Sequence, residues 1–173
     1  MGKFKQELKN IKAFVFDVDG VFTDGKILFT DEGRQMRNMN VKDGYAIHLA
    51  VKKNIPIGII TGGTCNSIVI RFNSLGVTDL YIASKNKMDN FLHFLNKYSL
   101  QPEDILYMGD DLPDYQVMKI VGLPTCPSDA SQDIKNISHY ISDKKGGEGC
   151  VRDVVEQTLR AKGMWMDTDA FVW

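Results

Sequence analysis

Two aspartates separated by one residue, Asp17 and Asp19, directly follow the apolar run Ala13 to Phe16. Alternate residues of an extended segment point the same way, so both carboxylates can face one site while Val18 turns away. Negative charges at the end of a buried strand are costly unless a partner neutralises them. The pair therefore requires a neutralising partner, which the rest of the sequence must supply or bind.

A second acidic group follows the apolar run 104–108 and consists of Asp110 and Asp111, with Asp114 about one helical turn beyond. In open α/β sheets the ligand site lies outside the carboxyl ends of the strands, so this group and the first pair are expected to converge there. Several carboxylates in one cleft repel each other unless a cation neutralises them. Oxygen ligands of this kind suit Mg²⁺, which binds one or two carboxylates together with a phosphate.

Groups that can bind an anion stand at two further strand ends. Thr61, Gly62 and Gly63 offer a hydroxyl and backbone N–H groups at the start of a helix, where anions bind readily. Lys87 opens the next predicted helix, although the helix dipole prefers acidic groups at that end. A phosphate between the two stretches would remove this conflict, so we expect a phosphate site beside the metal.

The elements that position these residues alternate between strand and helix along the chain. Short runs rich in β-branched residues predict buried strands, and helical spacing of apolar residues predicts the helices. This alternation is typical of an α/β fold, and we expect a Rossmann-like three-layer sandwich with a parallel sheet and right-handed crossovers. The predicted strands are 11–16, 55–60, 80–82, 104–108, 123–126 and 139–142, and the predicted helices are about 43–53, 65–75, 86–98, 112–121 and 148–162.

The segment 20–41 breaks this alternation. KILFT and RQMRNMNV flank Asp31-Glu32-Gly33, which is a turn signal, so we predict a β-hairpin insertion after the first strand. The insertion, about 21–41, is too short to be a cap domain. We therefore expect one domain over 1–173, with a C-terminal tail at about 163–173.

Composition excludes several classes of function. The chain has 173 residues, 43% hydrophobic and 25% charged, with a net charge of −1, so no nucleic-acid partner is indicated. No apolar run approaches the ~20 residues of a membrane span, and the polar N-terminus does not resemble a signal peptide. We expect a cytoplasmic protein that acts on a small molecule.

Four motifs together resemble those of the haloacid dehalogenase superfamily of phosphatases: Asp17-Val18-Asp19-Gly20-Val21, Thr61-Gly62, Lys87 and Gly109-Asp110-Asp111. Four further stretches are similar to its small capless branch, which includes 3-deoxy-D-manno-octulosonate 8-phosphate (KDO 8-phosphate) phosphatases: 21–33, 41–45, 68–77 and 145–154. The resemblance covers nearly the whole chain. It implies a Mg²⁺-dependent phosphatase of KDO 8-phosphate in lipopolysaccharide sugar biosynthesis.

The resemblance also implies a role for each motif residue. Asp17 is the nucleophile that forms an aspartyl-phosphate, and Asp19 is the general acid and then the base. Thr61, Gly62 and Lys87 stabilise the transferring phosphoryl group. Mg²⁺ is held by Asp17, the Asp19 carbonyl and Asp110, while Asp111 and Asp114 hold metal waters or Lys87.

The residues that select the sugar are less defined by the resemblance. Asp43 and Arg71 are candidates for sugar or carboxylate contacts, since an Arg fork matches a carboxylate. Phosphatases of nine-carbon keto-deoxy sugar (nonulosonate) 9-phosphates resemble this chain but carry a Glu and a Lys where Gly63 and Ser74 stand. This departure favours the eight-carbon substrate, although many octulosonate relatives carry Arg at the place of Gly63. The nonulosonate phosphatase remains the alternative, and a non-catalytic domain would be expected to lose Asp17 or Asp19.

The related phosphatases are tetramers in which the hairpin of one subunit covers a neighbour's site. The apolar hairpin residues Ile27, Leu28 and Phe29 suit this arrangement, so we expect a homotetramer. The tail carries Trp165 and Trp173, and it is also expected to contribute to a neighbouring active site.

Overall fold

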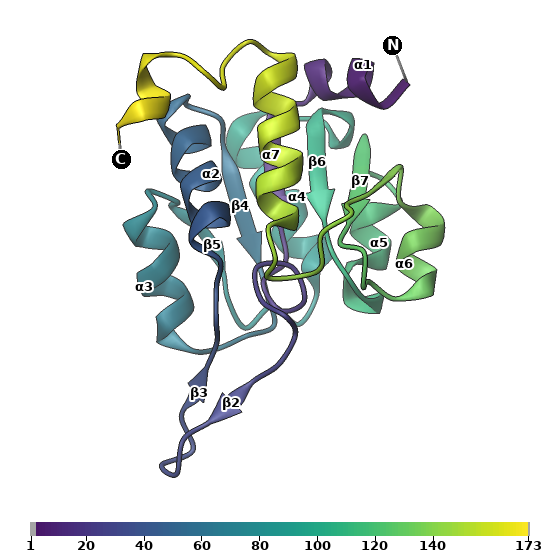
Figure 1. Ribbon diagram of the computed structural model, residues 1–173. Coiled ribbons are helices and arrows are strands. Elements are labelled where there is room, and N and C mark those ends of the chain that lie inside the picture. Colours follow the sequence, from purple (N-terminus) through teal and green to yellow (C-terminus); the bar gives the residue numbers. More distant parts are fainter. Residues whose placement is uncertain (1–2, 173) are drawn as a thin grey trace.

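The computed structural model describes residues 3–172, so the predicted role of Trp173 lies outside the described residues. Its centre is a six-stranded parallel sheet with the order β5-β4-β1-β6-β7-β8 (Figure 1). The strands are β1 (Ala13–Phe16), β4 (Ile57–Ile60), β5 (Asp79–Tyr81), β6 (Ile105–Met108), β7 (Leu123–Cys126) and β8 (Tyr140–Ile141). The predicted fold class is confirmed, and all six predicted strands form within two residues of their expected bounds.

Helices cover both faces of this sheet. One face is packed by α1 (Lys3–Asn10), α2 (Val41–Lys52), α3 (Asn66–Ser74) and α7 (Cys150–Ala161). The other face is packed by α4 (Lys87–Tyr98), α5 (Tyr115–Met118) and α6 (Gln132–Ile137). Short 3₁₀ turns η1 (Pro102–Asp104), η2 (Leu112–Asp114) and η3 (Thr168–Phe171) complete the elements.

Alternation along the central strands builds the two cores. Phe14 and Phe16 of β1 point into the α2–α7 core, whereas Ala13 and Val15 point into the α4–α5 core. All four are fully buried, as expected for a strand with helices on both faces. Because both faces of β1 are buried, its register in the sheet is fixed. The register in turn determines where the residues after Phe16 lie at the edge of the sheet.

Three helical features differ from the prediction. The helices α1 and α6 were not predicted, because α1 is mostly polar and α6 has only six residues. The expected helix 112–121 forms as η2 followed by the short α5. Pro113 lies in the first turn of η2, and the buried side chain of Asp114 ends that turn, so a regular helix begins only at Tyr115.

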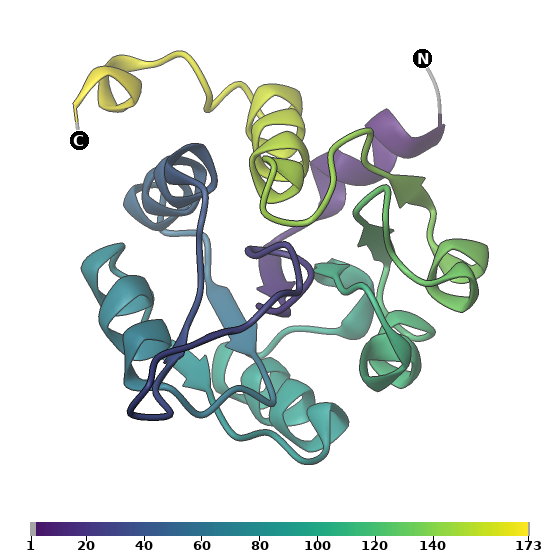
Figure 2. The same cartoon turned by 60° about the horizontal axis from the view of Figure 1, so that its bottom comes forward.

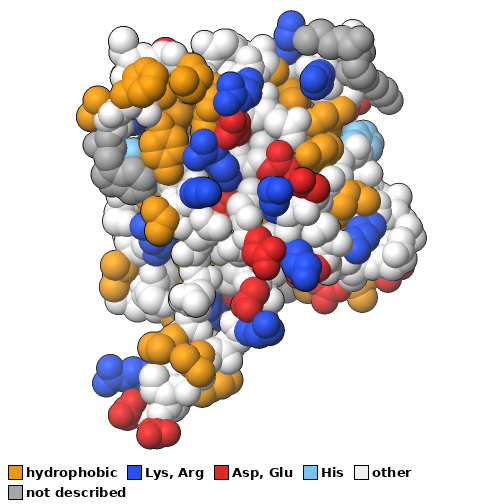
Figure 3. Space-filling model, viewed as in Figure 1, with side chains coloured by type: hydrophobic (Ala, Val, Ile, Leu, Met, Phe, Trp, Pro, Cys, Tyr) orange, Lys and Arg blue, Asp and Glu red, His pale blue; other side chains and the backbone are white. Residues whose placement is uncertain are grey.

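The predicted hairpin is present between β1 and α2. Its strands β2 (Leu28–Phe29) and β3 (Gln35–Met36) pair antiparallel around a turn in which Gly33 has a φ of 76°. The hairpin projects away from the body of the molecule at the end where the strands of the sheet terminate (Figure 1). Leu28 and Phe29 are 62% and 61% exposed, and hydrophobic side chains gather on this projection in Figure 3.

The described part of the tail lies at the opposite end of the molecule from the hairpin (Figure 1). Trp165 is only 5% exposed and packs edge-on against Tyr45, with the Arg152 guanidinium over its ring. Lys53 forms ion pairs with Asp167 and Asp169 of the tail. These contacts hold the described part of the tail on its own chain, and its contribution to a neighbouring active site stays a prediction.

Within residues 3–172, the structure contains no helix that is both long enough and apolar enough to cross a membrane.

Candidate active site

The candidate site lies at the carboxyl ends of β1, β4 and β6, which Figure 2 brings forward. A cavity of about 390 Å³ opens there, which is within the range of small-molecule sites. Its lining comes from the segments after β1 and β4, the loop before α4, the first turn of α4, the turn η2 and the start of α5: Asp17, Asp19, Thr61, Gly62, Gly63, Ser84, Lys85, Asn86, Lys87, Met88, Pro113 and Gln116.

Asp17 lies at the floor of this cavity. Its backbone N–H continues the β1–β6 ladder by donating to the carbonyl of Met108, so the register of the sheet places its side chain. One carboxylate oxygen accepts from the Val18 N–H at 2.7 Å, and the other lies 2.7 Å from the Lys87 ammonium. Burial and the nearby Asp114 raise the pKa of Asp17 to about 7, while Lys87 opposes this rise.

Lys87 connects two carboxylates beneath the cavity. Its side chain is 6% exposed, and its Nζ lies 2.7 Å from Asp17 Oδ2 and 2.7 Å from Asp114 Oδ1. Burial alone would lower the Lys87 pKa, but the carboxylates of Asp114 and Asp17 raise it. The expected conflict with the helix dipole is therefore already resolved by two carboxylates, which corrects the expectation that a phosphate is needed for this.

Asp114 is buried, and its carboxylate contacts three other residues of the site. It is 1% exposed, accepts from the hydroxyl of Tyr107 at 2.6 Å, and accepts from the Asp110 N–H at 3.3 Å. These contacts hold Lys87 in place and orient the loop that carries Asp110. No local pattern marks Tyr107 as a functional residue, because it stands within an apolar run that predicts a buried strand.

Asp110 completes an acidic cluster that fits a metal ion. Carboxylate oxygens of Asp17, Asp110 and Asp114 lie within 4.8 Å of one another. Burial and the charge of Asp114 raise the pKa of Asp110 to about 7, so the cluster lacks sufficient positive charge. Asp110 packs against Gly20, whose φ is 80°, and a Cβ at Gly20 would collide with the Asp110 carboxylate. This oxygen-rich donor set suits a hard cation such as Mg²⁺.

The Thr61–Gly63 turn forms the opposite wall. Thr61 is 1% exposed, and its hydroxyl accepts from the Gly63 N–H at 3.0 Å. The turn is pinned to the loop before α4, because the N–H of Ser84 donates to the Thr61 carbonyl and the N–H of Ala83 donates to the Gly63 carbonyl. This geometry presents a hydroxyl and main-chain groups to the cavity in front of α3, which suits an anion.

Asp19 has a partner that sequence reasoning missed. The guanidinium of Arg37, at the end of the hairpin, donates from Nε to Asp19 Oδ1 at 2.6 Å and from Nη2 to Asp19 Oδ2 at 2.9 Å. The two residues are 18 positions apart, and nothing in the local pattern of RQMRNMNV distinguishes Arg37 from the neighbouring Arg34.

The predicted sugar-binding residues Asp43 and Arg71 are not among the residues that line this cavity. Asp43 is completely buried, and one of its oxygens accepts from the Arg152 N–H at 2.6 Å in the first turn of α7. Arg71 packs its guanidinium against Gly44 of α2. The sugar contacts of these two residues stay a prediction. Asp111 precedes η2, where its carbonyl accepts from the Asp114 N–H at 2.9 Å.

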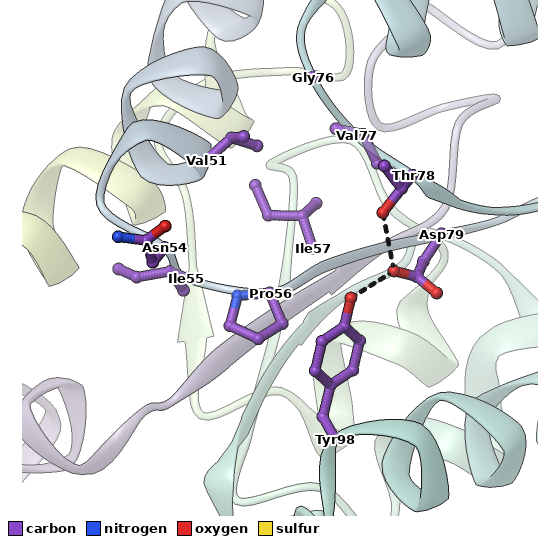
Figure 4. A pocket seen from close by; sticks show the side chains of 10 residues that line it. All are labelled: Val51, Asn54, Ile55, Pro56, Ile57, Gly76, Val77, Thr78, Asp79 and Tyr98. Atoms are coloured by element: carbon purple, nitrogen blue, oxygen red, sulfur yellow. Dashed lines mark hydrogen bonds between the residues drawn. The ribbon is translucent and has the colours of Figure 1, made fainter.

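A second cavity, of about 190 Å³, lies at the other end of the sheet, beside the first residues of β4 and β5 (Figure 4). The carboxylate of Asp79, which lines this cavity, accepts from the hydroxyls of Tyr98 at 2.6 Å and Thr78 at 3.2 Å. It also forms an ion pair with Lys97 at 2.6 Å. These donors satisfy the carboxylate, so the second cavity lacks the unneutralised charge found at the carboxyl ends of the strands.

Comparisons with known proteins agree with this geometry. Residues 56–152 match the family of haloacid dehalogenase-like hydrolases. The chain is 38% identical over 155 residues to a KDO 8-phosphate phosphatase of Salmonella typhi, covering 90% of this chain and 82% of the relative.

Two solved structures are similar over most of their length. The KDO 8-phosphate phosphatase of Yersinia pestis is 37% identical with a TM-score of 0.90, covering 92% of this chain and 86% of that one. The KDO 8-phosphate phosphatase of Moraxella catarrhalis, in complex with magnesium ion, phosphate ion and KDO, is 30% identical with a TM-score of 0.91. That match covers 99% of this chain and 97% of the Moraxella chain.

Proposed function

This chain belongs to the family of haloacid dehalogenase-like hydrolases, and we propose that it hydrolyses KDO 8-phosphate to KDO and inorganic phosphate. The observation that carries this proposal is the position of Asp17: a buried carboxylate beside Lys87 and Asp110, at the floor of a cavity that the Thr61–Gly63 turn lines. The names of the similar enzymes support KDO 8-phosphate as the substrate.

The reaction begins with Asp17. A carboxylate oxygen of Asp17 attacks phosphorus in line, and the bond between phosphorus and the C8 oxygen breaks as the aspartyl-phosphate forms. Asp19 gives its proton to the departing C8 oxygen, so KDO leaves as a neutral alcohol at that position. Asp19 then takes a proton from the water that attacks phosphorus, which releases phosphate and restores the Asp17 carboxylate.

The rest of the cavity stabilises charge on the phosphoryl oxygens. Thr61 and the Gly62 N–H would donate to these oxygens, while the Lys87 ammonium would lie close to both them and Asp17. Asp114 holds Lys87 in place from below, at 2.7 Å. Each of these groups is fixed before substrate arrives, so little reorganisation is needed during the reaction.

We propose Mg²⁺ as the cofactor, held by the Asp17 and Asp110 carboxylates and the Asp19 carbonyl. When bound, it shields the phosphate from the negative charge of the nucleophile. The support is the fit of the acidic cluster and the magnesium complex of the Moraxella relative. Asp111 is proposed to orient metal waters, and Asp114 acts through Lys87.

The assembly and location belong to the same proposal. We propose a cytoplasmic homotetramer in which the hairpin of one subunit covers the cavity of a neighbour. The support is the strong exposure of Leu28 and Phe29 on a ribbon that lacks a covering layer within the described chain. A lone two-stranded ribbon with such side chains is only marginally stable.

Phosphate release from a panel of sugar phosphates tests the substrate. The panel contains KDO 8-phosphate and a nonulosonate 9-phosphate, with Mg²⁺ present and Asp17→Asn as the blank. We expect a kcat/KM at least tenfold higher for the eight-carbon substrate, or about 1.4 kcal/mol of transition-state discrimination. A higher kcat/KM for the nonulosonate 9-phosphate would contradict the proposal and indicate a role in nonulosonate metabolism. It would also show that Gly63 and Ser74 do not indicate the substrate.

A further inference from the structure

Arg37 makes a two-point contact with the proposed general acid. Its side chain is 3% exposed although it comes from the projecting hairpin, and its two bonds to Asp19 occupy both carboxylate oxygens. A bidentate arginine–carboxylate pair fixes the plane of the carboxylate as well as its distance. Asp19 itself is 32% exposed, so without Arg37 it would face the open cavity with free rotation about its side-chain bonds.

The same guanidinium also contacts two other segments. Nη1 lies 2.9 Å from the Cys65 sulfur, just before α3, and 3.3 Å from the Gln35 side-chain oxygen in β3. A Cβ at Gly63 would lie 3.5 Å from Nη2, at van der Waals distance, so the Thr61–Gly63 turn borders the guanidinium. Arg37 therefore joins the loop after β1, the Thr61–Gly63 turn and the hairpin at one point.

We propose that Arg37 is a positioning residue, which holds the Asp19 carboxyl in the orientation from which it reaches the leaving oxygen and makes that orientation depend on the hairpin. The inference rests on the proposed function, because it assigns Asp19 the proton transfer described above. As general acid, Asp19 must first take up a proton from solvent on one carboxylate oxygen, which opens the bond to Arg37 at that oxygen, and it then gives this proton to the leaving oxygen. The other bond keeps the carboxyl in place, which a single-point partner could not do as well.

The test compares two substrates that need proton donation to different extents. A sugar alkoxide is a poor leaving group and needs the general acid, whereas the p-nitrophenolate of p-nitrophenyl phosphate leaves readily without it. We expect Arg37→Ala to lower kcat for KDO 8-phosphate by about tenfold or more, within the range that general acids contribute. For p-nitrophenyl phosphate the same variant should keep kcat within about threefold.

Two further variants separate positioning from a structural effect. Arg37→Lys keeps the charge but only one contact, so it should recover part of the lost kcat and also provides a folded variant if Arg37→Ala unfolds. In an Asp19→Asn background, Arg37→Ala should change kcat for KDO 8-phosphate by less than twofold, since the group it orients is absent. Arg160→Ala, which removes an exposed pair with Glu156, is the matched control.

Equal losses on both substrates, or a loss that persists in the Asp19→Asn background, would overturn the inference and leave the proposed function standing. An unchanged kcat for KDO 8-phosphate in Arg37→Ala would overturn it as well. Failure of the proposed function has a different signature: the unsubstituted protein would release no phosphate from KDO 8-phosphate above the Asp17→Asn blank, and the inference would fall with it.

Discussion

Charge balance at single residues explains why the cavity should bind a cation. Asp17, Asp110 and Asp114 approach one another within 4.8 Å, but the only ammonium ion-paired to them in residues 3–172 is that of Lys87. Burial and the neighbouring carboxylate of Asp114 raise the pKa of both Asp17 and Asp110 to about 7. Metal binding requires the ionised carboxylates, so protons and metal compete for the same oxygens.

We therefore predict that Mg²⁺ affinity rises with pH. The pKa of these aspartates is 3.8 in the unfolded chain and about 7 in the folded, metal-free protein. Between these two pH values the folded, metal-free protein therefore binds more protons than the unfolded chain. Its stability should fall as pH rises through this window, whereas stabilisation by Mg²⁺ should grow. Calorimetric titration should give a Kd about tenfold or more weaker at pH 6 than at pH 8. A Kd that is equal at the two pH values would contradict the prediction, and Asp133→Asn provides an exposed control.

Among the elements, α7 is held by a residue of another helix. Gly149 at its N-cap has no side chain to cap the helix, and Asp43 of α2 instead accepts from the Arg152 N–H. The loop before α7 contacts the turn after β1, since the Gly147 N–H donates to the Val21 carbonyl at 2.9 Å. Asp43 therefore supports the active-site turn indirectly, through α7.

This arrangement predicts a pH-dependent effect of Asp43→Asn. Burial raises the pKa of Asp43 to about 6, although the N–H groups of Arg152 and Gly149 oppose this. Ionisation of the buried group thus lowers stability as pH rises from about 4 to 6, and asparagine keeps an acceptor without this cost. The Tm of Asp43→Asn relative to the Tm of the parent should therefore be higher at pH 8 than at pH 5. Each kcal/mol of unfolding free energy corresponds to about 2–4 °C in Tm. A pH-independent difference would contradict this role.

The tail gives a second prediction at the scale of elements. Trp165 is nearly buried between α2 and α7, whereas its neighbour Met166 is 64% exposed. Trp165→Ala should release the tail and cost up to about 3 kcal/mol, while Met166→Ala should stay within about 0.5 kcal/mol. Hydrogen exchange over 163–172 measures the release directly. Unchanged protection in Trp165→Ala would show that the polar contacts of Lys53 are sufficient.

At the scale of the whole molecule, the hairpin presents a group of uncovered apolar side chains. Its apolar side chains Ile27, Leu28, Phe29 and Met36 are 39–62% exposed. Figure 3 shows hydrophobic side chains grouped on the projection. An exposed apolar group of this kind commonly marks an interface. The open cavity lies at the same end of the molecule, so one assembly could cover both.

We predict that the double variant Leu28→Asp and Phe29→Asp converts a tetramer into monomers and lowers kcat/KM for KDO 8-phosphate by about tenfold or more, because two buried charges would oppose the interface. Light scattering on size-exclusion peaks measures the assembly. Leu92→Asp, which places the same charge on an exposed leucine of α4, should remain tetrameric. A parent protein that is a fully active monomer would refute the hairpin cover.

The sequence by itself determined the sheet and the placement of its strand ends. Buried runs such as 105–108 have a local signature, and parallel strands bring their carboxyl ends to one edge. Asp17, Thr61 and Asp110 could therefore be grouped from their positions after three such runs. The structure brings these residues to the same end of the sheet, with Lys87 beside them.

Only the tertiary structure decided which side chains complete the site. The pairs of Arg37 with Asp19 and Asp43 with Arg152 join residues 18 and 109 positions apart. Local periodicity fixes the element on which a side chain lies, but not the neighbouring element that packs against it. The contact of Asp43 with the first turn of α7 and the contact of Arg37 with Asp19 were consequently not expected. Such contacts depend on how whole elements pack, and that packing is a property of the complete chain.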